Sequence, residues 1–197
     1  MYLYLVRHGQ SVGNVLRTFH GQTDYPLTEK GTEQARQAAE KLKDDGVIFT
    51  RCCASDLSRA WDTALACLEG REVVPECCPA LREQNVGNIE GFTWEQMEEQ
   101  YPNELHAFLE NWFCTTPPGG ESAQTMEARV AACVDEIIAR GEDTLIAAHF
   151  GSLSLILVHL GLMSGEQAFT QEWAFGQGTY SAIRIENGKA ELIHFNR

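Results

Sequence analysis

The sequence predicts an α/β protein, a three-layer α/β/α sandwich with a mainly parallel, mixed β-sheet and an antiparallel edge strand. Short, apolar β-rich runs alternate with longer helical segments, which is typical of parallel β-α-β units. The 197 residues are enough for one domain to bury most of its apolar surface without disulfides or a structural metal. Near the C-terminus, Asn187-Gly188 separates two β-rich runs and predicts an antiparallel hairpin at the sheet edge.

In the first half of the chain, β-rich runs and helical periodicities alternate twice. Serine and threonine mark the expected helix starts, because their hydroxyls accept hydrogen bonds from the unpaired N–H groups of a first turn. The expected elements are, in order, a strand over Tyr2–Arg7, a helix capped by Thr28 and ending at Asp44-Asp45-Gly46, a strand over Val47–Cys53, a helix capped by Ser55 and ending at Leu68, and short extended pieces at Val73-Val74 and Ala80-Leu81.

The second half contains an aromatic-rich helical segment and a final hairpin. Proline disfavours a helical conformation in the preceding residue, so a break is expected at Tyr101-Pro102. The expected elements are helices within Thr93–Phe113, a rigid loop over Thr116–Gly120, a helix capped by Ser122 and ending at Arg140, a strand over Thr144–Ala148, a helix over Ser152–Leu160, and strands over Ser181–Ile185 and Ala190–Phe195. We interpret residues 1–197 as a single domain with a helical cap insert at about 84–125, and we expect the Trp and Phe residues of 92–113 in the core more than in a pocket.

The overall charge excludes several classes of protein. With 28 Asp and Glu against 15 Lys and Arg, the net charge of −13 argues against binding to nucleic acid or to an anionic membrane surface. The segment Met1–Arg7 lacks the features of a signal peptide, and Leu153–Leu160 is too short to span a bilayer. The seven cysteines form no C-x-x-C pair, which favours reduced thiols in a cytoplasmic protein over a zinc or redox site.

Two glycine-containing motifs match known sites only formally. The run Gly9-Gln10-Ser11-Val12-Gly13 fits the nucleophile elbow of serine hydrolases. That fold needs an earlier strand and helix to complete its oxyanion hole, and only eight residues precede Gly9. Catalysis by Ser11 is therefore disfavoured. The run Gly176–Ser181 begins like a dinucleotide-binding fingerprint but lacks its third glycine.

Charged and ionisable residues follow several of the predicted strands. Arg7-His8 follows the first strand, Arg59 lies shortly after the second, Glu83 follows Leu81, and His149 follows Thr144–Ala148. Ligands of open α/β sheets bind at the carboxyl ends of the strands, so these side chains are expected to converge there. Arginine binds phosphate oxygens through two parallel hydrogen bonds. The pattern predicts a phosphate site with an acid beside it.

At this point the residues resemble the histidine phosphatase superfamily, also called phosphoglycerate mutase-like, over residues 5–151. The matching blocks run in family order: Leu5-Val6-Arg7-His8-Gly9-Gln10-Ser11 with Asn14; Gly21-Gln22-Thr23-Asp24 with Pro26-Leu27-Thr28 and Gly31; Ala54-Ser55-Asp56-Leu57-Ser58-Arg59-Ala60 with Thr63-Ala64; Leu81-Arg82-Glu83 with Gly87 and Glu90-Gly91; Pro118-Gly119-Gly120-Glu121-Ser122; and Ala148-His149-Phe150-Gly151.

The resemblance implies covalent phosphoryl transfer. His8 would be the nucleophile and form a phosphohistidine, which divides one difficult displacement into two easier ones. Arg7, Arg59 and His149 would bind the phosphoryl oxygens and stabilise the charge of the transition state. Glu83 would protonate the leaving oxygen and then take a proton from the attacking water. The scheme uses no cofactor and no metal ion.

Other residues of the blocks are assigned to substrate binding or are alternatives for the acid. Asn14, Gln22 and Thr23 are expected to bind substrate. Glu90 and Glu121 lie in the same region as Glu83 and are alternatives for its role. The remaining histidines match no block and are expected to be structural: His20, His106, His159 and His194.

Some positions depart from the family pattern and bear on the shape of the pocket. Gln10 replaces a frequent glutamate, Val12-Gly13 replaces a bulkier pair, and Phe150 stands where small residues are common, which would narrow the site. The segment after Glu83 lacks the longer insert typical of the mutases and looks like the alpha-ribazole phosphatase-like and broad-specificity phosphatases. Residues 83–128 carry nine carboxylates and no Lys or Arg, so a cap formed by this segment would discourage a second phosphate.

We therefore expect a metal-independent phosphomonoesterase acting on a small phosphorylated metabolite with a neutral or weakly charged, aromatic or apolar leaving group. Its partners would be that metabolite or inorganic phosphate, with no nucleic acid and no membrane. A homodimer is left open. The alternatives are a cofactor-dependent phosphoglycerate mutase, a non-catalytic binder of phosphorylated ligands, and a serine hydrolase.

Overall fold

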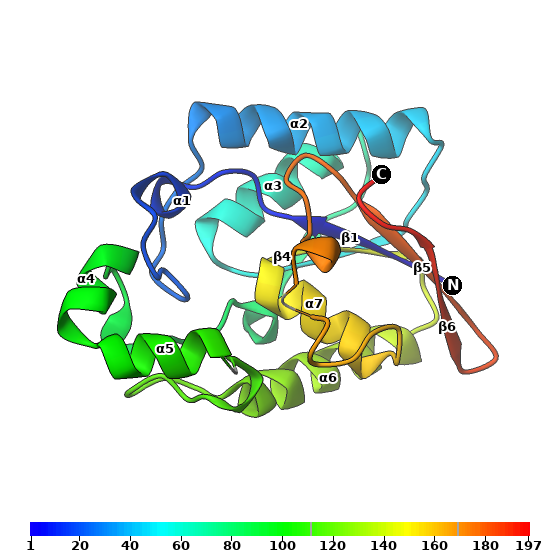
Figure 1. Ribbon diagram of the computed structural model, residues 1–197. Coiled ribbons are helices and arrows are strands. Elements are labelled where there is room, and N and C mark those ends of the chain that lie inside the picture. Colours follow the sequence, from blue (N-terminus) through cyan, green and yellow to red (C-terminus); the bar gives the residue numbers. More distant parts are fainter. Residues whose placement is uncertain (111, 169) are drawn as a thin grey trace.

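The computed structural model describes residues 1–110, 112–168 and 170–197 and has a mixed β-sheet at its centre (Figure 1). Within the described residues the sheet has six strands in the order β3-β2-β4-β1-β5-β6. Strands β3, β2, β4 and β1 pair in parallel, whereas β5 pairs antiparallel with both β1 and β6. The strands are β1 (Tyr2–Arg7), β2 (Arg51–Ala54), β3 (Pro75–Cys77), β4 (Thr144–Ala148), β5 (Ser181–Glu186) and β6 (Lys189–His194). The predicted mainly parallel sheet with an antiparallel edge is confirmed.

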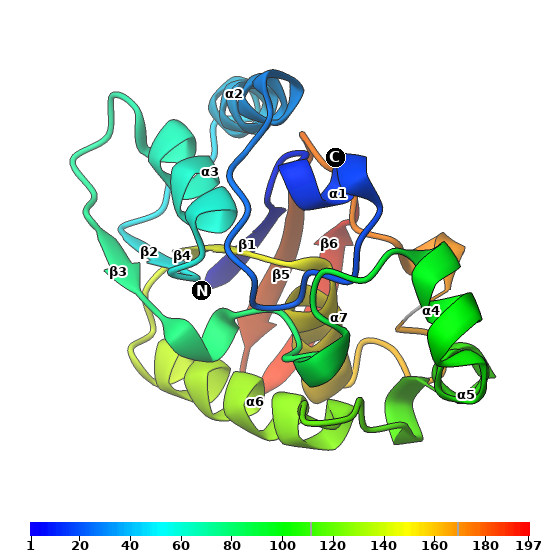
Figure 2. The same cartoon turned by 90° about the vertical axis from the view of Figure 1, so that its left-hand side faces the viewer.

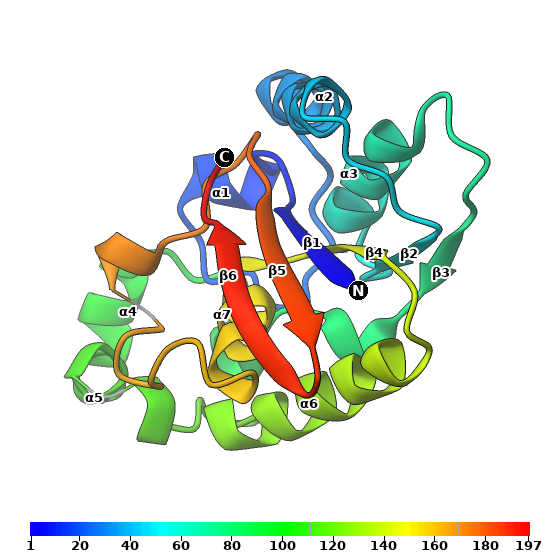
Figure 3. The same cartoon turned by 90° about the vertical axis from the view of Figure 1, so that its right-hand side faces the viewer.

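Helices cover both faces of this sheet and complete the three predicted layers (Figure 2). Helices α2 (Glu29–Asp44) and α3 (Ser58–Leu68) lie on one face, and α6 (Ala123–Ala139) and α7 (Phe150–His159) lie on the other (Figure 3). Three shorter helices lie on the side toward which β1 runs (Figure 1): α1 (Val12–Leu16), α4 (Trp94–Gln100) and α5 (Pro102–Glu110). Single 3₁₀ turns are η1 (Pro79–Leu81), η2 (Gly87–Ile89), η3 (Trp112–Cys114) and η4 (Gln171–Trp173).

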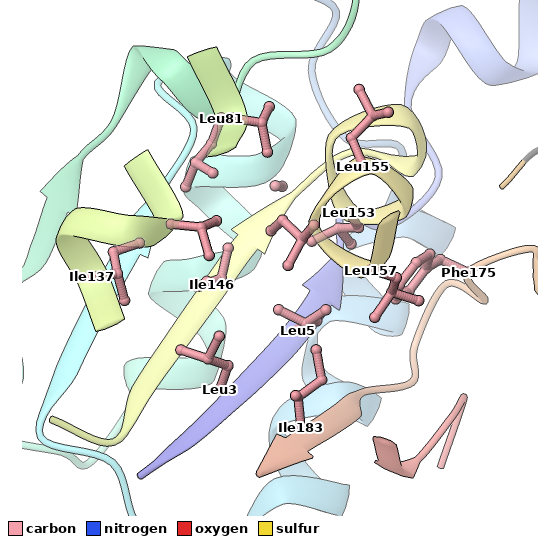
Figure 4. Packing of buried hydrophobic residues seen from close by; sticks show 14 of the residues in the cluster. Leu3, Leu5, Leu81, Ile137, Ile146, Leu153, Leu155, Leu157, Phe175 and Ile183 are labelled. Atoms are coloured by element: carbon pink, nitrogen blue, oxygen red, sulfur yellow. The ribbon is translucent and has the colours of Figure 1, made fainter. Parts of the chain in front are cut away.

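The two faces of β1 contribute to two separate hydrophobic clusters. Leu3 and Leu5 pack with Ile146 beneath α6 and α7 (Figure 4), whereas Tyr4 and Val6 face α2 and α3. This alternation follows from the two-residue period of a strand, which points successive side chains to opposite faces. Burying each leucine stabilises the fold by about 1.5–3 kcal/mol. The clusters hold the sheet, and with it the ends of its strands, in a fixed position.

Several predicted elements coincide with the structure. The bounds of β1 and β4 are those predicted, and Thr28 and Ser122 accept hydrogen bonds from the backbone N–H groups of Gly31 and Thr125. The break at Tyr101 separates α4 from α5 as expected. Asn187 and Gly188 both have positive φ angles, 50° and 73°, as a tight hairpin turn requires.

Other predicted elements were wrong in place or kind. The strand expected from Val47 begins only at Arg51, because the Val47 N–H bonds to the Leu42 carbonyl and closes the end of α2. Ser55 does not cap α3, which starts after Leu57 without a side-chain cap. The remaining differences are that β3 replaces the extended piece at Val73-Val74, Ala80-Leu81 lies in η1, α7 begins at Phe150 instead of Ser152, and α1 had not been predicted.

Across the described ranges, no helix has both the length and the apolar character needed to cross a membrane.

Candidate active site

The carboxyl ends of β1 and β4 open onto a cavity of about 300 Å³. Five of the predicted site residues line it: Arg7, His8, Asn14, Arg59 and Glu83. His149 lies next to His8, with the centroids of the two rings 5.1 Å apart. Gln22 and Thr23 do not line the cavity. The structure therefore brings most of the predicted residues together at the expected end of the sheet.

His8 is held as a neutral imidazole. Only 3% of the residue is exposed, and its Nδ1 lies 2.7 Å from the Gly9 carbonyl oxygen. A carbonyl can only accept a hydrogen bond, so Nδ1 carries the proton and Nε2 keeps its lone pair. Burial, together with the charges of Arg7 and Arg59, holds the pKa of His8 well below its ordinary value. The ring is thus prepared as a nucleophile through Nε2.

His149 directly follows β4, precedes the first residue of α7 and is completely buried. Its Nε2 lies 2.8 Å from the Oγ atom of Ser55, which fixes the orientation of the ring. Burial and then the charge of Arg59 lower the pKa of His149 well below its ordinary value. Ser55, which sequence analysis assigned to a helix cap, is therefore a part of the site that was missed.

Arg59 brings a positive charge into the interior without a carboxylate partner. The residue has 0% exposure, and its guanidinium donates to the carbonyls of Thr23 at 2.9 Å and Gly21 at 2.8 Å. Arg7 donates to the Phe175 carbonyl at 2.9 Å. Within the described part of the chain, neither arginine forms a salt bridge. Because a buried cation is costly unless it is paired, this arrangement favours binding of an anion.

Glu83 faces the cavity at the N-terminus of α7. Its Oε2 accepts the N–H of Gly151 and its Oε1 accepts the N–H of Gln84, both at 3.0 Å. The N-terminus of a helix stabilises a nearby carboxylate through the unpaired N–H groups of its first turn. A Cβ atom at Gly151 would lie 2.2 Å from the Oε1 of Glu83, so the carboxylate can take this position only because residue 151 has no side chain.

Glu90 and Glu121, the two alternatives to Glu83, form contacts outside the cavity. Glu121 forms a salt bridge of 2.6 Å with Arg129, and that arginine also donates to the Glu83 carbonyl at 3.0 Å. Glu90 accepts hydrogen bonds from the N–H groups of Gln22 and Thr23 and, at 2.6 Å, from the Thr23 hydroxyl. Neither glutamate lines the cavity. Both support the loops around it, which leaves Glu83 as the candidate acid.

The three expected substrate-binding residues differ in position. Asn14 lines the cavity, and its Oδ1 accepts hydrogen bonds from the Ser11 N–H and the Gln177 amide. Gln22 and Thr23 lie behind Arg59, to which Thr23 offers its carbonyl. Glu90 holds the loop of these two residues against the buried guanidinium, and direct contact of their side chains with substrate stays a prediction.

Sequence analysis missed one histidine and the wall of the cavity. His20, expected to be structural, lines the cavity, and burial lowers its pKa. The wall is largely aromatic and is formed by Phe19, Trp94, Phe108, Trp112 and Phe150. Aromatic residues within 92–113 had been assigned to the core, and no spacing pattern in the sequence distinguishes a pocket wall from a core.

Ser11 has 0% exposure and does not line the cavity. Its Oγ accepts the N–H of Asn14 and caps α1. The serine of the apparent nucleophile elbow is therefore a helix cap that does not reach the cavity. No group of three or more His, Cys, Asp or Glu residues in the described ranges is placed to hold a metal ion.

Comparison with known proteins identifies the family. The model of the histidine phosphatase superfamily (branch 1) matches residues 3–197. The chain belongs to the histidine phosphatase superfamily. An adenosylcobalamin/alpha-ribazole phosphatase of Salmonella typhimurium is 34% identical, over 100% of this chain and 96% of that protein. A 2,3-bisphosphoglycerate-dependent phosphoglycerate mutase of Bartonella tribocorum is 35% identical, over 88% of each chain.

The fold comparison agrees with the family assignment. The crystal structure of the alpha-ribazole phosphatase from Shigella flexneri superimposes with a TM-score of 0.91 and 30% identity, covering 100% of this chain and 96% of that one. The expected phosphoglycerate mutase-like fold is thus confirmed, and the chain is an enzyme of the phosphatase type within this superfamily.

Proposed function

We propose that the protein is a metal-independent phosphomonoesterase that transfers the phosphoryl group of a small ester first to His8 and then to water. The observation that carries this proposal is the buried imidazole of His8, whose Nδ1 is bonded to the Gly9 carbonyl and which lies beside two arginines that have no carboxylate partner among the described residues. A nucleophile and an anion site together provide what covalent phosphoryl transfer needs.

The first half-reaction forms a phosphoenzyme. Arg7 and Arg59 bind the phosphoryl oxygens, with His149 beside them, and so stabilise the charge of the transition state. The lone pair of His8 Nε2 forms the N–P bond while the P–O bond to the leaving group breaks. Glu83 donates its proton to the leaving oxygen. In the second half-reaction Glu83 takes a proton from water, which attacks phosphorus and releases His8 and inorganic phosphate.

The cavity wall supports hydrolysis over mutase activity. A mutase has to hold a second anionic group while the phosphoryl group returns to the substrate. The cations Arg7 and Arg59 are already assigned to the transferred group, and the remaining wall is largely aromatic. Of the nine carboxylates in residues 83–128, only Glu83 lines the cavity, and repulsion of a second phosphate by this segment stays a prediction. The wall instead favours a leaving group that is apolar or aromatic.

A mutase remains the second candidate because the Bartonella relative with that activity in its name is 35% identical. Conversion of 3-phosphoglycerate to 2-phosphoglycerate in the presence of 2,3-bisphosphoglycerate tests it directly. Isomerisation much faster than hydrolysis would replace the proposed function.

The decisive experiment is a screen of alkyl and aryl phosphomonoesters with and without EDTA. We expect hydrolysis that persists in EDTA, is abolished in His8→Ala and is retained within a few-fold in Ser11→Ala. Rapid quenching with a labelled substrate should trap an acid-labile phosphoenzyme that His8→Ala does not form. A metal requirement, or loss of activity in Ser11→Ala alone, would contradict the mechanism.

A further inference from the structure

The loop 174–180, directly before β5, lies behind two residues of the active-site cavity. The Phe175 carbonyl accepts a hydrogen bond from Arg7 at 2.9 Å, and the Gln177 amide donates to Oδ1 of Asn14 at 3.2 Å. Arg7 and Asn14 line the cavity, whereas Phe175 and Gln177 do not. Gln177 also pairs with Arg7 in an isolated parallel bridge. One loop, at least 163 positions away in the sequence, therefore supports two groups that face the cavity.

Three donors hold the side-chain amide of Asn14 in one orientation. Besides Gln177, the Ser11 N–H donates to Oδ1 at 3.0 Å and the Ser11 hydroxyl donates to it at 3.1 Å. A backbone N–H can only donate, so the Asn14 atom that faces Ser11 is the oxygen and not the nitrogen. Neither Ser11 nor Gln177 lines the cavity, so Nδ2 is the end of the amide that is turned toward it.

This orientation decides whether Asn14 attracts or repels an anion. The two ends of an asparagine amide have nearly the same shape, but the NH₂ end donates hydrogen bonds and the oxygen only accepts them. With Nδ2 toward the cavity, Asn14 offers N–H groups to a phosphoryl oxygen. A reversed amide would direct the partial negative charge of its own oxygen at the anion. Holding the amide in the observed orientation is therefore a contribution to phosphate binding.

The glycines beside Gln177 give this loop its course. Gly176-Gln177-Gly178 is the run that begins like a dinucleotide-binding fingerprint. Gly178 has a φ angle of 76°, in the left-handed region that favours glycine. A Cβ atom there would lie 3.3 Å from the Gln34 carbonyl oxygen of α2, which is closer than an ordinary contact. The run is therefore a turn that passes close to α2 and places Gln177 beside Asn14.

We propose that Gln177 is a positioning residue for phosphoryl transfer, which holds Asn14 so that its Nδ2 donates to an oxygen of the transferred group. The proposal rests on the proposed function. Asn14 contacts the phosphoryl group, and Gln177 acts only through Asn14. One hydrogen bond between neutral groups corresponds to about a twofold to tenfold change in an equilibrium constant. The two hydrogen bonds from Ser11 remain when Gln177 is replaced, so the loss should be of that size.

The test measures binding of inorganic phosphate to the intact protein by calorimetry and kcat/KM for p-nitrophenyl phosphate. Gln177→Met keeps the length of the side chain and removes its donor, and both quantities should fall about threefold to tenfold. Gln177→Glu should lose more, about tenfold or more, because its carboxylate faces the Asn14 oxygen and can only accept hydrogen bonds. Wild-type phosphate affinity in both variants overturns the proposal.

Two comparisons separate positioning from damage to the loop. Thr179→Val removes a hydroxyl that bonds to the Gly176 carbonyl of the same loop at 3.1 Å, and it should keep the phosphate affinity of the wild type. In an Asn14→Ala background, where no amide remains to be oriented, Gln177→Met should cost nothing further. An equal cost of Gln177→Met in both backgrounds contradicts action through Asn14 and overturns the proposal.

Phosphate binding and hydrolysis distinguish failure of this proposal from failure of the proposed function. A protein whose phosphate affinity depends on Gln177 as described, but which hydrolyses no phosphomonoester, refutes the proposed function and leaves the positioning of Asn14 established. Hydrolysis that requires His8 but is unchanged in both Gln177 variants refutes the positioning role alone.

Discussion

Adding one methyl group at Gly151 tests whether the position of Glu83 controls catalysis. In Gly151→Ala the new Cβ would lie 2.2 Å from the Oε1 of Glu83, whereas ordinary contacts begin near 3.4 Å. The carboxylate therefore has to move by about 1 Å. Such a displacement costs on the order of a hundredfold in rate, which corresponds to about 2.7 kcal/mol in the activation free energy.

The same change should leave stability intact. Gly151 lies in the first turn of α7 with an ordinary helical backbone, which alanine can adopt without strain. The atom that must give way is the end of a side chain that partly faces a cavity, so the clash is relieved without moving the backbone. We expect an unfolding midpoint equal to that of the wild type or slightly higher, together with a large fall in kcat.

The assay compares esters whose leaving groups differ in basicity. An alkyl phosphate needs a proton from Glu83, whereas p-nitrophenyl phosphate releases a stable anion and needs it much less. Gly151→Ala should therefore lose most activity on the alkyl ester. Glu83→Gln should likewise lose more activity on the alkyl ester than on p-nitrophenyl phosphate. The double variant should be as active as Glu83→Gln alone. An equal loss on both esters, or a loss that follows a lower melting temperature, would refute this explanation.

Five further outcomes are expected. The lowered pKa values keep His8 and His149 neutral in the folded state, so the unfolded chain binds protons first, and the free energy of unfolding in urea should fall as the pH drops below about 6.5. The nucleophile should nevertheless remain active at pH 6, and a loss of kcat/KM that follows an ordinary histidine titration would contradict this. Inorganic phosphate at a hundred times its Kd should stabilise the wild type by about 2.7 kcal/mol, and calorimetry should show no such gain in Arg59→Met. Arg129→Met, which removes one of the two side-chain hydrogen bonds to the Glu83 carbonyl, should lower kcat more than it raises KM. Phe108→Ala should raise KM for aryl phosphates and leave KM for small alkyl phosphates unchanged.

Features that depend on local sequence were predicted well. The bounds of β1 and β4, and the turn at Asn187-Gly188, follow from patterns a few residues long. The convergence of Arg7 and Arg59 at one end of the sheet also follows from where the strands end.

Features that depend on distant contacts were missed. The hydrogen bond between Ser55 and His149 joins residues 94 positions apart. His20 enters the cavity because its loop wraps the guanidinium of Arg59, and a buried cation of this kind cannot be recognised from spacing. The aromatic wall was assigned to the core because a side chain that lines a pocket and one that fills a core have the same apolar character.

The central position of β1 has a consequence for synthesis of the protein. β1 pairs with β4 on one side and with β5 on the other, and Arg7 is held by the carbonyl of Phe175. During synthesis, β1 is therefore made long before β4 and β5, the strands that pair with it. The proposed phosphate site would be completed only when the ribosome has released the segment that contains β5, so shorter nascent chains would neither bind phosphate nor gain stability from it.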